Sequence, residues 1–250
     1  MGLRSEIRKL LGLKKAFYPD EISDDVGVRY RNLSSSLHDP LFKAAWGEAK
    51  IGNKEAWRGK VPDVRYRAYT ALWAAKHGLS LPGDFVECGV FTGLLSMTIC
   101  HALDFARVDK TFYLFDTYNG VPEGGLTGDE LADAKQHNAR LYFDCFEIAK
   151  RNFSPWPNAK LIRGILPGTL VEAPIERIAY LSIDLNSAAA EKSVIAELWD
   201  RLTPSAIVIL DDYGFGGYAP QHAMWNEFAR SKGGAIYSSP TGQGILVKPS

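Results

Sequence analysis

The chain has 250 residues, of which 46% are hydrophobic and 23% are charged. These fractions are typical of globular proteins, and the length allows one large α/β domain or two small ones. Lysine plus arginine and aspartate plus glutamate number 29 each, so the formal net charge is zero. This balance argues against a nucleic-acid-binding protein, which would normally carry a basic excess.

Cysteine usage and hydropathy indicate a protein of a reducing compartment. The three cysteines, Cys88, Cys100 and Cys145, show no CxxC spacing, so neither a disulfide framework nor a zinc site is indicated. No apolar run approaches the ~20 residues that span a bilayer, and no signal-peptide pattern is evident. We therefore expect a cytoplasmic protein without a transmembrane segment.

The first pattern along the chain is "LRSEIRKLLGLKK", which predicts a basic amphipathic helix. Such a helix can lie on a membrane surface. It can equally dock on its own domain or on a second subunit, and the shortness of its apolar stripe together with Glu6 favours docking. We expect a homodimer or a higher homo-oligomer.

Residues 1–62 are predicted to form a helical and irregular extension, and residues 63–250 the main domain. The segment 19–62 is rich in turn residues and is expected to cover a site or to contact a second subunit. Within it, Trp46 and Trp57 either line a substrate pocket or anchor the extension. A helix with a glycine stop follows at 64–78.

From residue 83 onward, apolar or β-rich runs alternate with helical patterns. This alternation predicts βαβ units and a largely parallel, seven-stranded sheet of the α/β class. The last two runs are joined by the short link "SPTGQ" and should pair as a hairpin, which makes the last strand antiparallel. The predicted strands are 84–88, 111–116, 160–164, 178–184, 206–211, 235–238 and 244–248, and the predicted helices are 93–106, 130–152, 187–202 and 218–231.

The stretch "FVECGVFTG" places a glycine turn directly after the first strand of this sheet. Open α/β sheets bind ligands at the carboxyl ends of their strands, so this turn is the expected ligand site. A dinucleotide fingerprint beginning at Gly89 would need glycines where the chain has Phe91 and Leu94. No P-loop lysine follows either, so both phosphate-binding motifs are excluded.

The acid that ends the strand, Glu87, indicates a cationic ligand, since a carboxylate repels a pyrophosphate. S-adenosylmethionine carries positive charge on its sulfonium and its α-amino group. Gly89 would let the backbone approach this ligand, and the amides that open the 93–106 helix would face its carboxylate. The expected contacts around the turn also include Cys88, Val90 and Gly93. A plain tight turn with a surface glutamate, and Cys88 as a small packing residue, remain the alternative.

Two further strand ends extend the expected donor site. Asp116 ends the second strand, where an acid accepts hydrogen bonds from two adjacent ribose hydroxyls. Gly164 and Ile165 end the third strand and would form an apolar slot for adenine. The glycine-rich segment 118–130 is expected to be a loop over the site.

Three carboxylates end the fourth and fifth strands, at Asp184, Asp211 and Asp212. Neighbouring strands lie about 4.8 Å apart, so these charges would repel one another without a cation or protons. Carboxylate oxygens suit Mg²⁺, which could chelate an acceptor diol and lower the pKa of its hydroxyl. In the alternative, one aspartate caps the following helix and another pairs with an arginine.

Four motifs, "LPGDFVECGVFTG", "FDTYNGVPE", "RGILPGTLVEAPIERIAYLSID" and "LDDYG", resemble the macrocin O-methyltransferase family (TylF/MycF type) over roughly residues 65–250. The resemblance implies a Rossmann-like class I methyltransferase fold, S-adenosylmethionine as donor, and Mg²⁺-assisted methylation of a sugar hydroxyl in natural-product biosynthesis. It also implies metal ligands and cofactor contacts. By motif position the metal ligands are Asp184, Asp211 and Asp212, and the cofactor contacts include Glu87, Gly89, Asp116 and Thr117.

One position departs from the family pattern. After the fourth strand the family typically reads Asp-Gly-Asp-x-Tyr-x-Ser, whereas this chain reads "IDLNSAAAE". Asn186 therefore stands where an acid proposed as proton acceptor would be, and an amide cannot take a proton. We expect Asp184, Asn186 and His137 in the catalytic site, with His137 or His222 as candidate bases.

The acceptor is expected to be a small molecule that carries a hydroxyl, on a sugar or on another natural product. Loss of the family tyrosine suggests an acceptor other than a macrolide sugar. Two alternatives stay open: a metal-independent or non-methylating enzyme that binds S-adenosylmethionine, and a non-catalytic protein that binds it.

Overall fold

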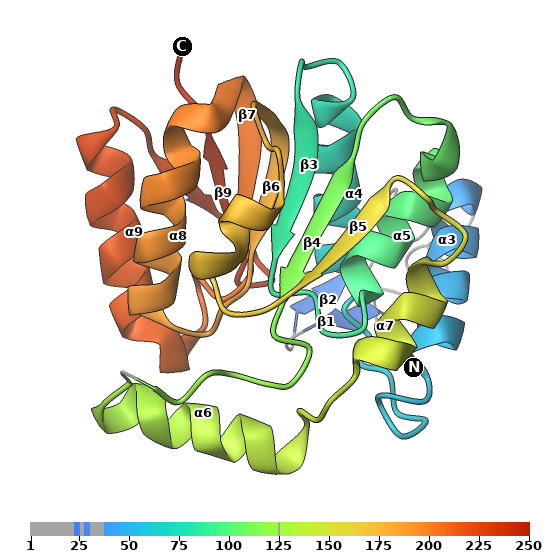
Figure 1. Cartoon of the computed structure of the whole chain (residues 1–250), viewed down its shortest axis with the longest axis horizontal. Coiled ribbons are helices and arrows are strands. Elements are labelled where there is room, and N and C mark those ends of the chain that lie inside the picture. The colour runs from blue at the N-terminus through green and yellow to red at the C-terminus, as the bar shows by residue number, and fades with distance from the viewer. Residues whose placement is uncertain (1–22, 26–27, 31–37, 125) are drawn as a thin grey trace, which may run out of the picture.

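The computed structural model describes residues 23–25, 28–30, 38–124 and 126–250. The helix predicted at the N-terminus lies outside these residues. In the described part of the chain, seven strands form one sheet in the order β5-β4-β3-β6-β7-β9-β8 (Figure 1). Its strands are β3 (Asp84–Cys88), β4 (Phe112–Asp116), β5 (Ala159–Arg163), β6 (Ile178–Ile183), β7 (Leu202–Leu210), β8 (Ile236–Ser238) and β9 (Gly244–Val247).

The pairing within the sheet confirms the predicted fold class. β3, β4, β5, β6 and β7 pair in parallel, whereas β9 pairs antiparallel with both β7 and β8. From β3, in the middle of the sheet, the chain runs outward through β4 to β5. It then returns to the other side of β3 to form β6 and continues outward through β7, so the strand order reverses between β3 and β6. A short separate hairpin is formed by β1 (Ser23–Asp25) and β2 (Val28–Tyr30).

Helices cover both faces of the sheet, because successive side chains of a buried strand point to opposite faces. Phe85 of β3 and Tyr180 of β6 belong to the core cluster beneath one helical layer, and Val86 and Leu181 belong to the cluster beneath the other. The first layer consists of α3 (Pro40–Asn53), α4 (Arg65–Gly78), α5 (Leu94–Leu103) and α7 (Phe146–Phe153). The second consists of α8 (Ala188–Leu198) and α9 (Ala219–Ser231).

The N-terminal extension contains a regular helix, α3, in a segment whose turn residues suggested irregular structure. The carboxylate of Asp39 caps this helix by accepting hydrogen bonds from Leu41 N at 2.9 Å and Phe42 N at 3.3 Å. Helical spacing then buries Phe42, Trp46 and Ala49 against α5. The division of the chain at residue 62 stays a prediction.

The single helix predicted over 130–152 is wrong. The structure has two helices there, α6 (Gly128–Arg140) and α7, separated by a non-helical break at 141–145. Figure 1 shows α6 below the sheet, on the side where β4 ends. No helix among the described residues is both long and apolar enough to span a membrane.

Candidate functional site

A cavity of about 450 Å³ opens at the carboxyl ends of β3, β4, β5 and β6. Its volume lies in the range typical of small-molecule sites, and its position is where open α/β sheets bind ligands. Most of the predicted site residues line it. They are Glu87, Gly89, Val90, Asp116, Thr117, Gly164, Ile165, Asp184, Asn186 and Asp211.

The glycine turn after β3 is fixed by its contact with the chain after β6. Gly89 has φ +90°, and a Cβ added there would lie 1.8 Å from the carbonyl oxygen of Asp184. A side chain is thus excluded both by backbone conformation and by space. Gly93, with φ +88°, begins α5 but does not line the cavity, and Cys88 is fully buried in the core. Cys88 therefore lies where a small packing residue would, which was the alternative to a cofactor contact.

Glu87 presents a buried carboxyl group to the cavity. The residue is 4% exposed, and its Oε2 atom has no hydrogen-bond partner among the described residues. Burial raises the pKa of Glu87 to about 8; the nearby Ser96 hydroxyl acts against this shift, and the charges of Asp211 and Asp116 add to it. A buried acceptor oxygen without a donor is costly, so this group is suited to a cationic donor from a ligand.

Asp116 holds the glycine turn through main-chain hydrogen bonds, a role that the sequence did not indicate. Its Oδ2 accepts from Val90 N and Phe91 N, each at 2.6 Å, and its Oδ1 accepts from Tyr118 N at 2.6 Å. The hydroxyl of Thr117 donates to the carbonyl oxygen of Gly120 at 2.5 Å. Asp116 therefore connects the turn after β3 to the turn after β4, and ribose hydroxyls would have to share its oxygens with these amides.

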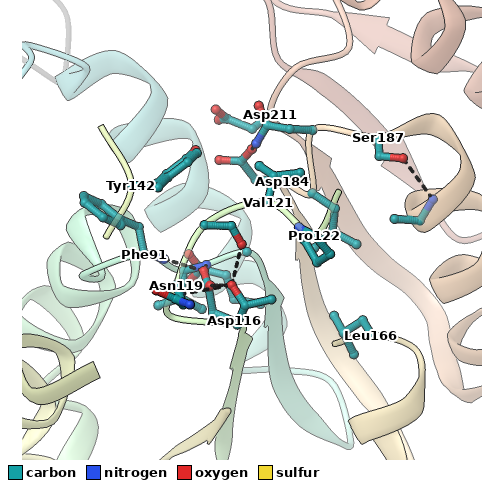
Figure 2. A pocket seen from close by; sticks show the side chains of 18 of the residues that line it. Phe91, Asp116, Asn119, Val121, Pro122, Tyr142, Leu166, Asp184, Ser187 and Asp211 are labelled. Carbon is teal, nitrogen blue, oxygen red and sulfur yellow. Dashed lines mark hydrogen bonds between the residues drawn. The ribbon is translucent and has the colours of Figure 1, made fainter. Parts of the chain in front are cut away.

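The three predicted metal ligands form one cluster. One carboxylate oxygen from each of Asp184, Asp211 and Asp212 lies within 4.8 Å of the others. Burial, followed by repulsion among the three carboxylates, raises the pKa of Asp184 and of Asp212 well above the ordinary value. Figure 2 shows Asp184 and Asp211 on the cavity side opposite Leu166.

Within this cluster Asp211 is already paired. Its Oδ2 accepts a hydrogen bond from Arg67 Nη1 at 2.6 Å, and its Oδ1 accepts from Gln243 Nε2 at 2.9 Å. Asp211 is therefore paired with an arginine, as the alternative to a metal site expected, and it still lies in one cluster with Asp184 and Asp212. By contrast, Oδ2 of Asp212 is buried with no partner among the described residues. Asp184 and Asp212 are the better placed to hold a divalent cation.

Asn186 links the cluster to the segment before α9. Its Nδ2 donates to Asp184 Oδ1 at 3.1 Å, and its Oδ1 accepts from the hydroxyl of Tyr218 at 2.8 Å. Neither candidate histidine lines the cavity. His137 lies in α6, and the Nδ1 atom of His222 is 2.9 Å from the carbonyl oxygen of Tyr213.

Several cavity residues were not predicted from the sequence. Arg67 of α4 reaches the acid cluster across 144 positions of the chain. Phe91 and Tyr142 also line the cavity. Of the two tryptophans for which the sequence left a pocket or an anchoring role open, Trp57 lines the cavity and Trp46 is buried in the core. Phe91 lies inside the glycine motif, but Tyr142 was hidden within the helix predicted over 130–152.

The strand order, the antiparallel β9 and the position of the cavity define a class I, Rossmann-like methyltransferase fold. A solved structure of the O-methyltransferase NovP matches with a TM-score of 0.68 and 21% identity, covering 87% of this chain and all of that one. A second structure, of a caffeoyl-CoA O-methyltransferase homologue from Staphylococcus aureus, matches with a TM-score of 0.60 and 13% identity, over 87% of this chain and all of that one. At these identities the likeness concerns the fold.

Sequence relatives define the family. The family profile described as macrocin-O-methyltransferase (TylF) matches residues 70–234, so the chain belongs to that family. Over 146 residues it is 29% identical to mycinamicin III 3''-O-methyltransferase of Micromonospora griseorubida, covering 53% of this chain and 56% of that protein. Over 146 residues it is 30% identical to demethyldecarbamoylnovobiocin O-methyltransferase of Streptomyces niveus, covering 54% and 55%. The chain thus aligns with about half the length of these relatives.

Proposed function

We propose that this chain is an S-adenosylmethionine-dependent O-methyltransferase that acts on a hydroxyl of a sugar or another small natural product. One observation carries the proposal. A single cavity is lined by the buried carboxyl of Glu87 on the glycine-turn side and by Asp184 and Asp211 on the other side, and Asp212, which does not line the cavity, completes their acid cluster. Family membership and the named activities of the relatives support the same reaction.

On the donor side, Glu87 would accept a hydrogen bond from the methionyl amino group through its unpartnered oxygen. Asp116 holds the glycine turn in place through the amides of Val90 and Phe91, and Ile165, 61% exposed, offers an apolar surface to adenine. When bound, the donor supplies a methyl group on a positively charged sulfonium. Because such a methyl needs little acid catalysis, the chief task of the chain is orientation.

On the acceptor side, Asp184 and Asp212 would hold a divalent cation, and Asn186 would orient Asp184 through its hydrogen bond at 3.1 Å. Mg²⁺ in this place would lower the pKa of an acceptor hydroxyl toward neutrality. Asn186 itself has no basic site, so proton acceptance would fall to Asp184 or to solvent.

A metal-independent transferase is the second candidate, and the pairing of Asp211 favours it. Arg67 and Gln243 already satisfy both oxygens of that carboxylate. Arg67 would then supply the positive charge next to the acids. Dependence of turnover on Mg²⁺ separates the two candidates.

Two measurements test the proposal. Isothermal titration should show micromolar binding of S-adenosylmethionine or S-adenosylhomocysteine, and no binding at millimolar ligand would refute it. The metal role is tested with EDTA and with Asp212→Asn, which removes one of the two proposed ligands. If methyl transfer survives both treatments, the metal-independent reaction is the correct one.

The proposal includes a homodimer or a larger homo-oligomer. Trp73 of α4 and Tyr237 of β8 are 48% and 62% exposed, which supports a further contact surface on this molecule. Light scattering after size-exclusion chromatography tests it, and a monomer at micromolar concentration would contradict it.

A further inference from the structure

Three aromatic side chains from distant parts of the chain meet in the cavity. Trp57 follows α3, Phe91 lies in the glycine turn, and Tyr142 lies in the break between α6 and α7. The ring centroids of Trp57 and Phe91 are 5.7 Å apart at an interplanar angle of 87°, and those of Phe91 and Tyr142 are 5.5 Å apart at 71°. We call these three residues the aromatic wall.

The aromatic wall differs from the aromatic residues of the core. Its three members are only partly buried and line the cavity, whereas Trp46 and Trp225 are buried in the core. Phe91 holds its place with φ +51°, a conformation that non-glycine residues rarely adopt. A wall that keeps aromatic faces accessible in a cavity is a surface for the apolar face of a ring.

Tyr142 also brings a hydroxyl group to the acid cluster. In Figure 2 the hydroxyl end of its ring faces the aspartates. A phenol hydroxyl can donate a hydrogen bond, and this one lies on the boundary between the Glu87 side and the acid-cluster side of the cavity.

We infer that the aromatic wall is the acceptor subsite, and that it binds a ring with an apolar face and two adjacent hydroxyls on its edge. The face would pack on Trp57 and Phe91, and the phenol of Tyr142 would donate a hydrogen bond to one ring oxygen. The other oxygen would then face Asp184. Tyr142 acts here as a positioning residue, and the inference rests on the proposed function.

The same ring chemistry is offered by a saturated sugar and by an aryl diol. Two probes represent them, methyl α-L-rhamnopyranoside and catechol. Each is titrated by calorimetry into the full chain that is already saturated with S-adenosylhomocysteine. The probe that binds identifies the kind of ring, because only the catechol ring is flat.

Variants at Tyr142 separate the two parts of the interaction. Tyr142→Phe keeps the ring and removes the donor, so the dissociation constant of the probe should rise about threefold to tenfold, as for loss of one hydrogen bond. Tyr142→Leu removes both and should weaken binding further. Tyr69→Phe, in α4 and outside the cavity lining, is the matched control and should change nothing. The affinity for S-adenosylhomocysteine should stay the same in all three variants, which a general structural defect would not allow.

Two results would overturn the inference. The first is that both Tyr142 variants bind the probes as tightly as the parent chain does. The second is that neither probe binds the loaded parent chain at millimolar concentration. Failure of the parent chain to bind S-adenosylhomocysteine at all is a different outcome, because it refutes the proposed function and the acceptor subsite with it.

Discussion

Binding of S-adenosylhomocysteine should release a proton from Glu87. The pKa of this buried carboxyl is about 8, so most of the group is protonated at neutral pH. An acid of this pKa is about one half ionised at pH 8, one eleventh at pH 7 and one hundredth at pH 6. Only the ionised form pairs with the amino group of the ligand. The affinity should therefore fall about fivefold from pH 8 to pH 7 and about fiftyfold from pH 8 to pH 6.

The assay is isothermal titration at pH 7 in two buffers of different ionisation enthalpy. The parent chain should release about 0.9 proton per ligand bound. Glu87→Gln should release none, should lose the pH dependence between pH 6 and pH 8, and should bind about tenfold to a hundredfold more weakly at pH 8. The control Glu147→Gln removes a carboxylate that is 76% exposed, and should behave like the parent chain.

Equal affinity of the parent chain at pH 6 and pH 8, with no buffer dependence, would show that Glu87 does not face the ligand amino group.

The raised pKa of Glu87 also affects the stability of the fold. The unfolded chain loses this proton near 4.5 and the folded chain near 8, so the unliganded protein should become less stable as the pH rises through that window. Glu87→Gln should flatten that decline in thermal unfolding.

Three further substitutions test the packing around the cavity. Glu191→Gln replaces one buried acceptor oxygen by an NH2 donor, which would face donors such as the indole N–H of Trp225, now 2.6 Å from Glu191 Oε2. The change should cost about 1–3 kcal/mol in unfolding by urea, and an unchanged midpoint would contradict this network. Asn186→Asp adds a carboxylate to the acid cluster, so the metal-free chain should melt earlier and bind Mn²⁺ more tightly, as followed by electron paramagnetic resonance; unaltered Mn²⁺ affinity would place the ion elsewhere. Gly89→Ala should abolish folding because the new Cβ would meet a carbonyl oxygen at 1.8 Å, whereas Gly168→Ala, which meets nothing within 4 Å, should not; circular dichroism distinguishes them.

The sheet could be predicted from the sequence because its strands are buried on both faces. A strand such as β6, buried at every position, appears in the sequence as a continuous apolar run rather than as an alternating one. The antiparallel pairing of β8 and β9 could be predicted from the short link between them, because a link of a few residues can form only a hairpin. These signals are local, so one sequence was enough.

The positions of the acids were predictable for a related reason. Parallel strands end at the same edge of a sheet, so Asp184 and Asp211, each next to a strand end, had to lie near each other. Their partners were not predictable. Arg67 lies 144 positions from Asp211, and Gln243 lies 32 positions from it. Pairing of this kind depends on how α4 and the segment before β9 pack, which no local pattern contains.

The break between α6 and α7 explains why the acceptor side escaped prediction. The segment "HNARLYFDCFE" has no glycine or proline, so helical periodicity appeared to continue through it. Asp144 lies one residue before the N-cap of α7, Cys145, and in the structure Phe146 N donates to Asp144 Oδ1 at 3.3 Å. Cys145 N donates to the carbonyl oxygen of Tyr118 at 2.9 Å, which ties the break to the loop after β4. A tertiary contact therefore fixes the end of the break, and Tyr142, which lies within the break, lines the cavity.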